Sequence, residues 1–447
     1  MALPKTLRVL CLAGIAAALS SPSEAGELIT SFANNRPTLA TADGAFSLSM
    51  RATAQFDTGF YFQDGATTAS LTPALGRELS NGTNFRRGQF GIDGKLFKDF
   101  SYALILDFGG SSSDFKGRVA QAWVQYNGLK PFQFRIGAFA PFIGLEDSTS
   151  AADLVLIERP SASELSRSLT GADSRAAVQI AAIGQDYLAA FSYTGAKVTG
   201  DVPYDSQQAV NARLAYLLYS NQDTKWVGSL TGVYEFDAPD PAAGTTGPTN
   251  ISLSDRPEMR VDSLKLIGAT IDAESLLIGG VETGFVWKNF YSQGGWFTYH
   301  LTRRASALPD PDFSGWYLQA SWVLTGETRS YNPGRASFLN PKPAAPFGQG
   351  IGAWELAMRY SVMNLNDNAD LTPAAGGVRG GEQKILTTGV NWYPNSTVKF
   401  LFDYYYVDID RLSANAIAAS PPYPAVAAGA DIGQSYSAFN IRAQIAF

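Results

Sequence analysis

Eight basic side chains recur along the chain at positions that alternate with apolar residues. An arginine guanidinium offers several fixed N–H donors to an oxyanion, so a file of arginines facing water suits anions. The same side chains could instead pair with acidic neighbours and only solvate the wall that carries them. We keep both interpretations for each of Arg51, Arg87, Arg135, Arg175, Arg213, Arg359, Lys399 and Arg442. The acids of the same parity are Asp57, Asp93, Asp107, Glu355 and Asp403.

The long segment 140–174 carries a second group of charges. Up to Leu169 it holds five carboxylates against two arginines, a net charge of −3. We expect this segment to fold inward and to form a constriction. An acidic loop opposite a basic wall would produce a transverse field that orients zwitterionic solutes. The candidate constriction residues are Glu146, Asp147, Ser148, Ser150, Asp153, Glu158 and Arg159.

Enzymatic chemistry has little support in the sequence. A hydrolase needs a base, usually histidine, beside a nucleophile, and the single histidine is His300. It lies between Tyr299 and Leu301 on what we take as the inward parity of a strand, so we expect a hydrogen bond within the wall. No cluster with metal-ligand spacing is present, and no cofactor is expected. A net charge of −6 without a basic patch gives no support to nucleic-acid binding.

Alternation with a period of two identifies the elements that carry these residues. In the stretch 46–62, FSLSMRATAQFDTGFYF, phenylalanine, leucine, methionine and alanine occupy one parity, and most polar residues occupy the other. A strand separates the two sets on opposite faces, whereas a helix would mix them. The stretch is also longer than the five or six residues usual in soluble strands, and about nine to eleven residues span a bilayer. Similar alternation recurs in 132–138, 354–362, 398–406 and 439–447.

Composition agrees with strands that have one apolar and one polar face. Aromatic residues make up 12% and charged residues only 17% of the 447-residue chain, and the mean hydropathy is −0.05. Aromatic residues often begin or end the apolar parity, as in the aromatic girdles of a membrane barrel. The last residue, Phe447, closes an alternating stretch, a feature of barrels assembled in the outer membrane. These features predict an all-β, transmembrane antiparallel barrel.

The N-terminus has the pattern of a secretory signal peptide. Lys5 and Arg8 precede an apolar run from Val9 to Leu19, and Ser23 and Ala25 place small residues at a cleavage site. We therefore expect 1–25 to be a cleaved signal peptide and 26–447 to be a single barrel domain. The only cysteine, Cys11, lies in the leader, so disulfides are not expected in the mature chain.

Connection lengths set the expected number of strands. Short turns at 98–99, 127–131, 184–186, 220–224, 287–289 and 393–396 should lie on the periplasmic side, and the long segments 63–82, 140–174, 364–383 and 408–434 outside. A simple scan gives seventeen strands, which would place the two chain ends on opposite sides. Assigning 259–270 to one long external loop, 237–275, restores sixteen. The segment 326–352 is then a long periplasmic connection for which the sequence offers no reason.

Several motifs of the mature chain resemble the phosphate-selective porins O and P. The stretch GWYLQASW (315–322) followed by LTGE (324–327) is similar to a strand of that family, as is GAWELAMRYS (352–361). NWYPN (391–395) resembles its turn, and FRR (85–87), RIG (135–137) and GLE (144–146) also fit. The resemblance spans about 45–447. It implies a sixteen-stranded trimeric outer-membrane barrel with one long loop folded inward.

The resemblance also identifies a departure from the family pattern. In phosphate-selective members a lysine follows the glutamate of the GLE stretch and contributes to the anion site, whereas this chain has Asp147 there, followed by Ser148, Thr149 and Ser150. We therefore expect a homotrimeric outer-membrane porin for small hydrophilic solutes and ions, with a weak preference for anions. Its partners would be membrane lipid and small polar solutes.

Three other functions remain as alternatives. A carbohydrate-selective porin would line its path with aromatic residues such as Tyr61, Trp123 and Tyr317. A structural barrel would have its lumen plugged by the external loops 237–275 and 408–434. An outer-membrane hydrolase would need acidic pairs that no spacing identifies.

Adjacent arginines at 86 and 87 pose a local problem, because simple alternation turns only one of them inward. Arg87 shares the parity of Gln89 and Asp93 and is the stronger candidate for the interior. A β-bulge would turn both inward.

Overall fold

The computed structural model describes residues 27–32, 35–63, 77–110, 117–198, 207–239, 249–419 and 423–447. The expected signal peptide, 1–25, lies outside the described residues. No helix in the described ranges is long and apolar enough to cross a membrane.

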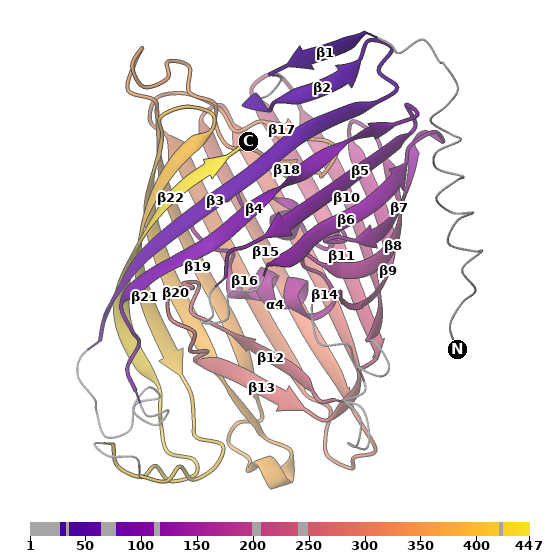
Figure 1. Cartoon of the computed structure of the whole chain (residues 1–447). Helices are drawn as coiled ribbons and strands as arrows, with labels where there is room; N and C mark the ends of the chain where they lie inside the picture. Colours follow the sequence, from indigo (N-terminus) through magenta and orange to yellow (C-terminus); the bar gives the residue numbers. More distant parts are fainter. Residues whose placement is uncertain are drawn as a thin grey trace, which may run out of the picture.

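Sixteen antiparallel strands close into a barrel, and two further strands extend the same sheet (Figure 1). The barrel closes where the last strand pairs with the first, from Ser437 opposite Phe62 to Ala446 opposite Thr53. The prediction of an all-β barrel with about sixteen strands is confirmed. Its strands are β3 (Ser47–Phe62), β4 (Gly82–Leu96), β5 (Phe100–Asp107), β6 (Arg118–Tyr126), β7 (Phe132–Ala138), β8 (Arg175–Ile183), β9 (Tyr187–Lys197), β10 (Gln208–Ser220), β11 (Thr224–Asp237), β14 (Ala273–Trp287), β15 (Phe290–Arg303), β16 (Asp312–Val323), β19 (Ala353–Asp367), β20 (Val378–Tyr393), β21 (Val398–Asp410) and β22 (Gln434–Ala446).

Side-chain burial follows the alternation of the sequence. Along β3, Gln55 and Asp57 are buried inside the barrel, while Phe56 and Phe60 are exposed on its outer face. Successive side chains of a strand point to opposite faces, so one sequence parity forms a continuous apolar outer belt. In a closed barrel every strand has two neighbours, which leaves no backbone edge exposed to lipid.

Short turns and the C-terminus lie at one end of the barrel, which we call the periplasmic end (Figure 1). A hairpin of β1 (Leu28–Ser31) and β2 (Thr38–Thr41) extends the sheet there by pairing with the start of β3. The long connections lie at the opposite, external end. One of them contains the 3₁₀ helix η2 (Pro373–Ala375).

Three connections enter the lumen rather than staying at the barrel ends. The first, 140–174, carries α3 (Leu145–Ser148) and α4 (Ser161–Thr170). The second, 238–272, forms a hairpin of β12 (Ile251–Asp255) and β13 (Ile267–Ile271), so assigning 259–270 to a loop outside the barrel sheet is confirmed. The third, 326–352, carries β17 (Tyr331–Asn332) and β18 (Ser337–Phe338). Buried residues within each connection show that all three pack inside the barrel.

A β-bulge resolves the orientation of the adjacent arginines. Gln55 pairs with Arg87 and the next residue, Phe56, pairs with Phe85, so Arg86 is the extra residue of β4. Both guanidinium groups then reach the interior carboxylate of Glu158, Arg86 at 2.7 Å and Arg87 at 4.0 Å. The bulge that was left open as an alternative is therefore present.

Candidate permeation pathway

A buried ion cluster joins the wall to the first infolded loop. Arg442 on β22 donates to both carboxylate oxygens of Asp57, at 2.6 and 2.7 Å, and to Glu158 at 2.7 Å. Burial alone would raise the pKa of Glu158, but Arg86, Arg442 and Arg87 hold this pKa well below its ordinary value. Glu158 therefore stays ionised, and it fixes the loop to β4 and β22 of the wall.

The second infolded loop is held by another carboxylate, that of Glu258. Its oxygens accept hydrogen bonds from the guanidinium of Arg359 and from the hydroxyl of Ser361 at 2.6 Å. The first backbone N–H of α4, that of Ser161, also donates to Glu258, at 3.0 Å. One buried carboxylate thus ties two loops to β19.

Arg213 of the wall and Arg329 of the segment itself hold the third infolded segment, 326–352, in place. Arg213 on β10 donates to the carbonyl oxygens of Arg335 and Ala336, at 2.7 and 2.9 Å. Arg329, within the segment, forms two 2.8 Å hydrogen bonds with Glu355 on β19. The segment that had no explanation in the sequence is therefore a structured part of the lumen.

Two more of the expected pore-lining cations also have buried partners. Lys399 donates to the carbonyl oxygen of Leu154 at 2.6 Å. Arg175 donates to the carbonyl of Gly171 at 3.0 Å and to the Gln207 side chain at 2.5 Å. Together with Arg87, which donates to Gln55 at 2.7 Å, these side chains hold infolded loops or neighbouring strands in place.

Arg51 and Arg135 differ from the other six, because both remain partly exposed inside the barrel. The guanidinium of Arg51 makes no hydrogen bond or ion pair with any described residue. Arg135 donates to Gln125 at 2.7 Å and lies over the ring of Trp123, 4.3 Å from its centroid. Stacking on an indole leaves the edge of a guanidinium free to donate further hydrogen bonds.

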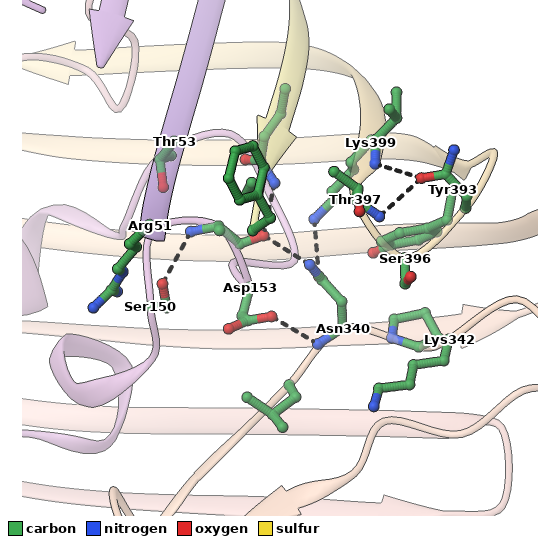
Figure 2. Close-up of a pocket in the computed structure, with 18 residues that line it drawn as sticks. Arg51, Thr53, Ser150, Asp153, Asn340, Lys342, Tyr393, Ser396, Thr397 and Lys399 are labelled. Carbon is green, nitrogen blue, oxygen red and sulfur yellow. Dashed lines mark hydrogen bonds between the residues drawn. The ribbon is translucent and has the colours of Figure 1, made fainter. Parts of the chain in front are cut away.

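A cavity of about 240 Å³ lies beside Arg51 at the periplasmic end (Figure 2). Figure 2 shows Arg51 and Thr53 of β3 facing Ser150 and Asp153 of the first loop. Asn340 of the third segment closes the cavity from the other side. Its backbone N–H donates to Asp153 at 3.0 Å and its side-chain amide to the carbonyl of Ala152 at 2.7 Å.

The expected constriction residues divide into an anchored group and a group near open space. Glu146 accepts from Gln293 and Gln319, Ser148 accepts from Arg213, and Arg159 donates to the carbonyl of Thr149. All three are buried, as is Glu158. Ser150 and Asp153 keep partial exposure. The side chain of Asp147 is only 3% exposed and forms an ion pair with Arg167 at 2.7 Å.

The placement of His300 corrects one expectation. Tyr299 and Leu301 are the buried neighbours, and the His300 side chain is 45% exposed and pairs with Asp312 on the adjacent strand, 2.8 Å away. The inward parity at this end is apolar because the second loop fills the lumen with Ile251, Leu253 and other core residues. The expected inward position of His300 was therefore wrong.

The three aromatic residues named for a sugar path have separate partners. Tyr61 packs against Tyr436, Tyr317 donates to Glu282 at 2.7 Å, and Trp123 lies under Arg135. Tyr61 and Tyr317 are buried. These contacts give no shared aromatic surface to the three side chains.

Arg335 is the charged residue that sequence reasoning missed. It lies in the turn between β17 and β18 and is partly exposed inside the barrel. Burial lowers the pKa of Arg335, whereas Asp147, Asp173 and Asp153 act in the opposite direction. No alternation surrounds this residue, so only the entry of its turn into the lumen, which is a tertiary feature, distinguishes it.

A closed barrel with an apolar belt, a polar interior and infolded loops defines the class of outer-membrane channels. A model of the family "Phosphate-selective porin O and P" matches residues 73–422, and the chain belongs to that family. It is 26% identical over 396 residues to Porin O of Pseudomonas aeruginosa, covering 84% of this chain and 86% of that protein. The protein is an outer-membrane porin that forms a channel for small solutes.

Solved porin structures share the fold. An anion-selective porin from Comamonas acidovorans superposes with a TM-score of 0.53 at 12% identity, covering 90% of this chain and all of that chain. OmpT of Vibrio cholerae gives a TM-score of 0.53 at 11% identity, over 90% of this chain and 98% of that one. A trimer form of OmpT gives 0.51 at 10% identity, over 90% of this chain and 100% of that one. At such identities the likeness concerns the fold alone.

Proposed function

We propose that the channel passes small inorganic and organic anions in weak preference to cations. The observation that carries this proposal is the free guanidinium of Arg51, beside an Arg135 that is stacked but still partly exposed. Charged side chains beside the path of an ion set the selectivity of a pore. The family description, phosphate-selective porin O and P, supports the same direction.

The acidic residues of the first loop argue for a weak preference rather than a strong one. Asp153 is partly exposed on that loop, and Asp147 is buried there in its ion pair with Arg167. Their negative charges oppose the arginines. Asp147 also occupies the position where phosphate-selective members have lysine. We therefore propose an anion channel without strong selectivity for phosphate.

A homotrimer embedded in outer-membrane lipid is the proposed assembly. The family membership and the trimer form of the OmpT neighbour support it. The exposed phenylalanine, leucine and tyrosine side chains of the outer belt suit contact with lipid and with neighbouring barrels. We also propose that 1–25 are removed on export.

The reversal potential in planar bilayers under a potassium chloride gradient tests this function. We expect single-channel steps and a reversal potential on the anion side, with phosphate and chloride differing little in permeability. A cation-side potential would contradict the anion preference. Absence of any steps would contradict an open pore and favour the structural barrel.

A further inference from the structure

The segment 326–352 passes from one face of the barrel wall to the other. After β16 it bends into the lumen, where Ala336, Ser337 and Phe338 are buried. It then returns over the rim, and the ring of Phe347 packs against Trp392 with centroids 5.6 Å apart. Phe347 is largely exposed beside the outer aromatic residues. The segment is thus held both inside and outside the wall.

Fixed contacts on both sides of the β17–β18 turn hold its backbone in place. Arg329 binds Glu355 before the turn, and Asn340 binds the first loop after it. At the turn itself, Arg213 donates to the carbonyl oxygens of Arg335 and Ala336. A cation of the wall therefore positions the main chain of residue 335.

The side chain of Arg335 is free although its backbone is fixed. Its guanidinium makes no hydrogen bond or ion pair within the part of the chain that the structure describes. This distinguishes it from Arg329, nine-tenths or more buried and bound to a carboxylate. The charge of Arg335 acts on the charges of Arg51 and Arg135.

We propose that Arg335 is a specificity-determining residue of the channel, a third free cation that enters the pathway from the periplasmic side. The inference rests on the proposed anion preference. It concerns a residue that lies outside the alternating strands of the barrel. Asp147, Asp153 and Asp173 of the first loop attract its charge. A permeating anion would be attracted by Arg51, Arg135 and Arg335 while it passes this acidic loop.

Neutralising Arg335 should change selectivity without unfolding the barrel. A unit charge about 7 Å from the path, in water with about 0.15 M salt, changes the ratio of anion to cation concentration by about two- to threefold once screening is included. We therefore expect Arg335→Gln to lower the chloride-to-potassium permeability ratio by that factor, and Arg335→Glu to lower it further. Lys288→Gln is the matched control, because Lys288 is an exposed cation whose ammonium lies 5.6 Å from the ring centroid of the outward-facing Trp287, where salt screens its field.

Different outcomes would contradict the inference about Arg335 and the proposed anion preference. If the wild-type channel prefers cations, the anion preference is wrong, yet Arg335→Gln should still shift the reversal potential further toward cations. If the wild-type prefers anions and Arg335→Gln leaves the ratio unchanged, the inference about Arg335 is wrong and the proposed function stands. An equal shift in Lys288→Gln would also overturn the inference.

A thiol at this position gives a second test that does not depend on one substitution. The only cysteine of the chain is Cys11, in the proposed leader, so Arg335→Cys would provide the single thiol of the mature protein. A cationic methanethiosulfonate should restore the anion preference, and an anionic one should lower it. Ala336→Cys is the control, because Ala336 is fully buried and should not react. Lack of reaction at 335 in folded channels would overturn the proposal.

Discussion

Inward-facing arginines on two sides of the lumen differ in burial and in their hydrogen-bond partners. On the wall from β8 round to β22, Arg213, Arg359 and Arg442 are buried and bound to infolded loops. On the wall from β3 to β7, Arg51 and Arg135 remain partly exposed, although Arg87 on β4 is buried near Glu158. All six occupy inward positions of alternating strands. Strand parity therefore decides which residues face the interior, and the infolded segments decide which charges remain free.

The difference has a physical cause in desolvation. A guanidinium removed from water needs carboxylate or carbonyl partners, and the packed side supplies them for each arginine. On the open side water itself can solvate the charge, so no partner is required. The packed arginines should therefore contribute to stability and the open ones to selectivity.

The largest expected effect comes from the same substitution made on each side. Arg442→Met leaves Asp57 buried without its ion-pair partner and should lower the free energy of unfolding by about 3–5 kcal/mol. Arg51→Met removes no described hydrogen bond and should change stability by less than about 0.5 kcal/mol. Denaturant unfolding in detergent, followed by gel mobility of the folded barrel, measures both.

Ion selectivity should distinguish the same two variants in the opposite order. Arg51→Met should lower the chloride-to-potassium permeability ratio about two- to threefold, while Arg442→Met channels that still fold should keep the wild-type ratio. Equal loss of stability in both variants would show that the two sides do not differ.

A smaller loss is expected from Arg329→Met in the third infolded segment. Glu355 would keep hydrogen bonds from Ser321, Asn391 and Tyr393, so the cost should be about 2–3 kcal/mol. The loosened segment should increase single-channel conductance or its fluctuations. Lys342→Met, on the same segment but exposed, is the control. Unchanged conductance and stability in Arg329→Met would show that this ion pair does not hold the segment.

The sequence could predict the barrel because its information is local. Alternation such as that in 46–62 depends on neighbours two residues away and predicts the strands, and the lengths of the connections then predict their number. The inward position of Arg335 depends instead on Arg213, more than a hundred residues earlier. His300 was misplaced for a similar reason, because the apolar filling opposite Tyr299 comes from a distant loop. Long-range packing therefore determines the positions of the site residues, whereas local alternation is enough to predict the fold.

Removal of one loop charge should have a modest effect on selectivity. Asp147 is paired with Arg167, which also lies 3.3 Å from Asp173 and 3.9 Å from Glu164. Asp147→Asn should therefore leave Arg167 paired and raise the chloride-to-potassium ratio by about 1.5- to twofold. Reversal potentials measure this ratio. Asp272→Asn, far from the interior in an exposed pair with Arg304, is the control. No change in Asp147→Asn would place the first loop away from the path of the ions.

The smallest expected effect concerns pH and the second infolded loop. Burial raises the pKa of Asp255, in the loop hairpin, to about 6 although Arg260 lies 3.1 Å away. Its ordinary value is 3.8. The folded state thus binds the proton more tightly than the unfolded state, and stability falls as pH rises from about 4 through 6.

Asp255→Asn should remove this dependence, since asparagine does not ionise. The variant should match the wild type near pH 4 and exceed it by about 1 kcal/mol at pH 8, the full benefit being reduced by the lost contact with Arg260. Denaturant unfolding at the two pH values measures the difference, and Asp272→Asn on the same loop should show none because its pair is exposed. A deficit at pH 8 would mean that Asp255 is ionised and that its attraction to Arg260 outweighs burial. Packed carboxylates of this lumen would then resemble Glu158, which the surrounding arginines keep charged.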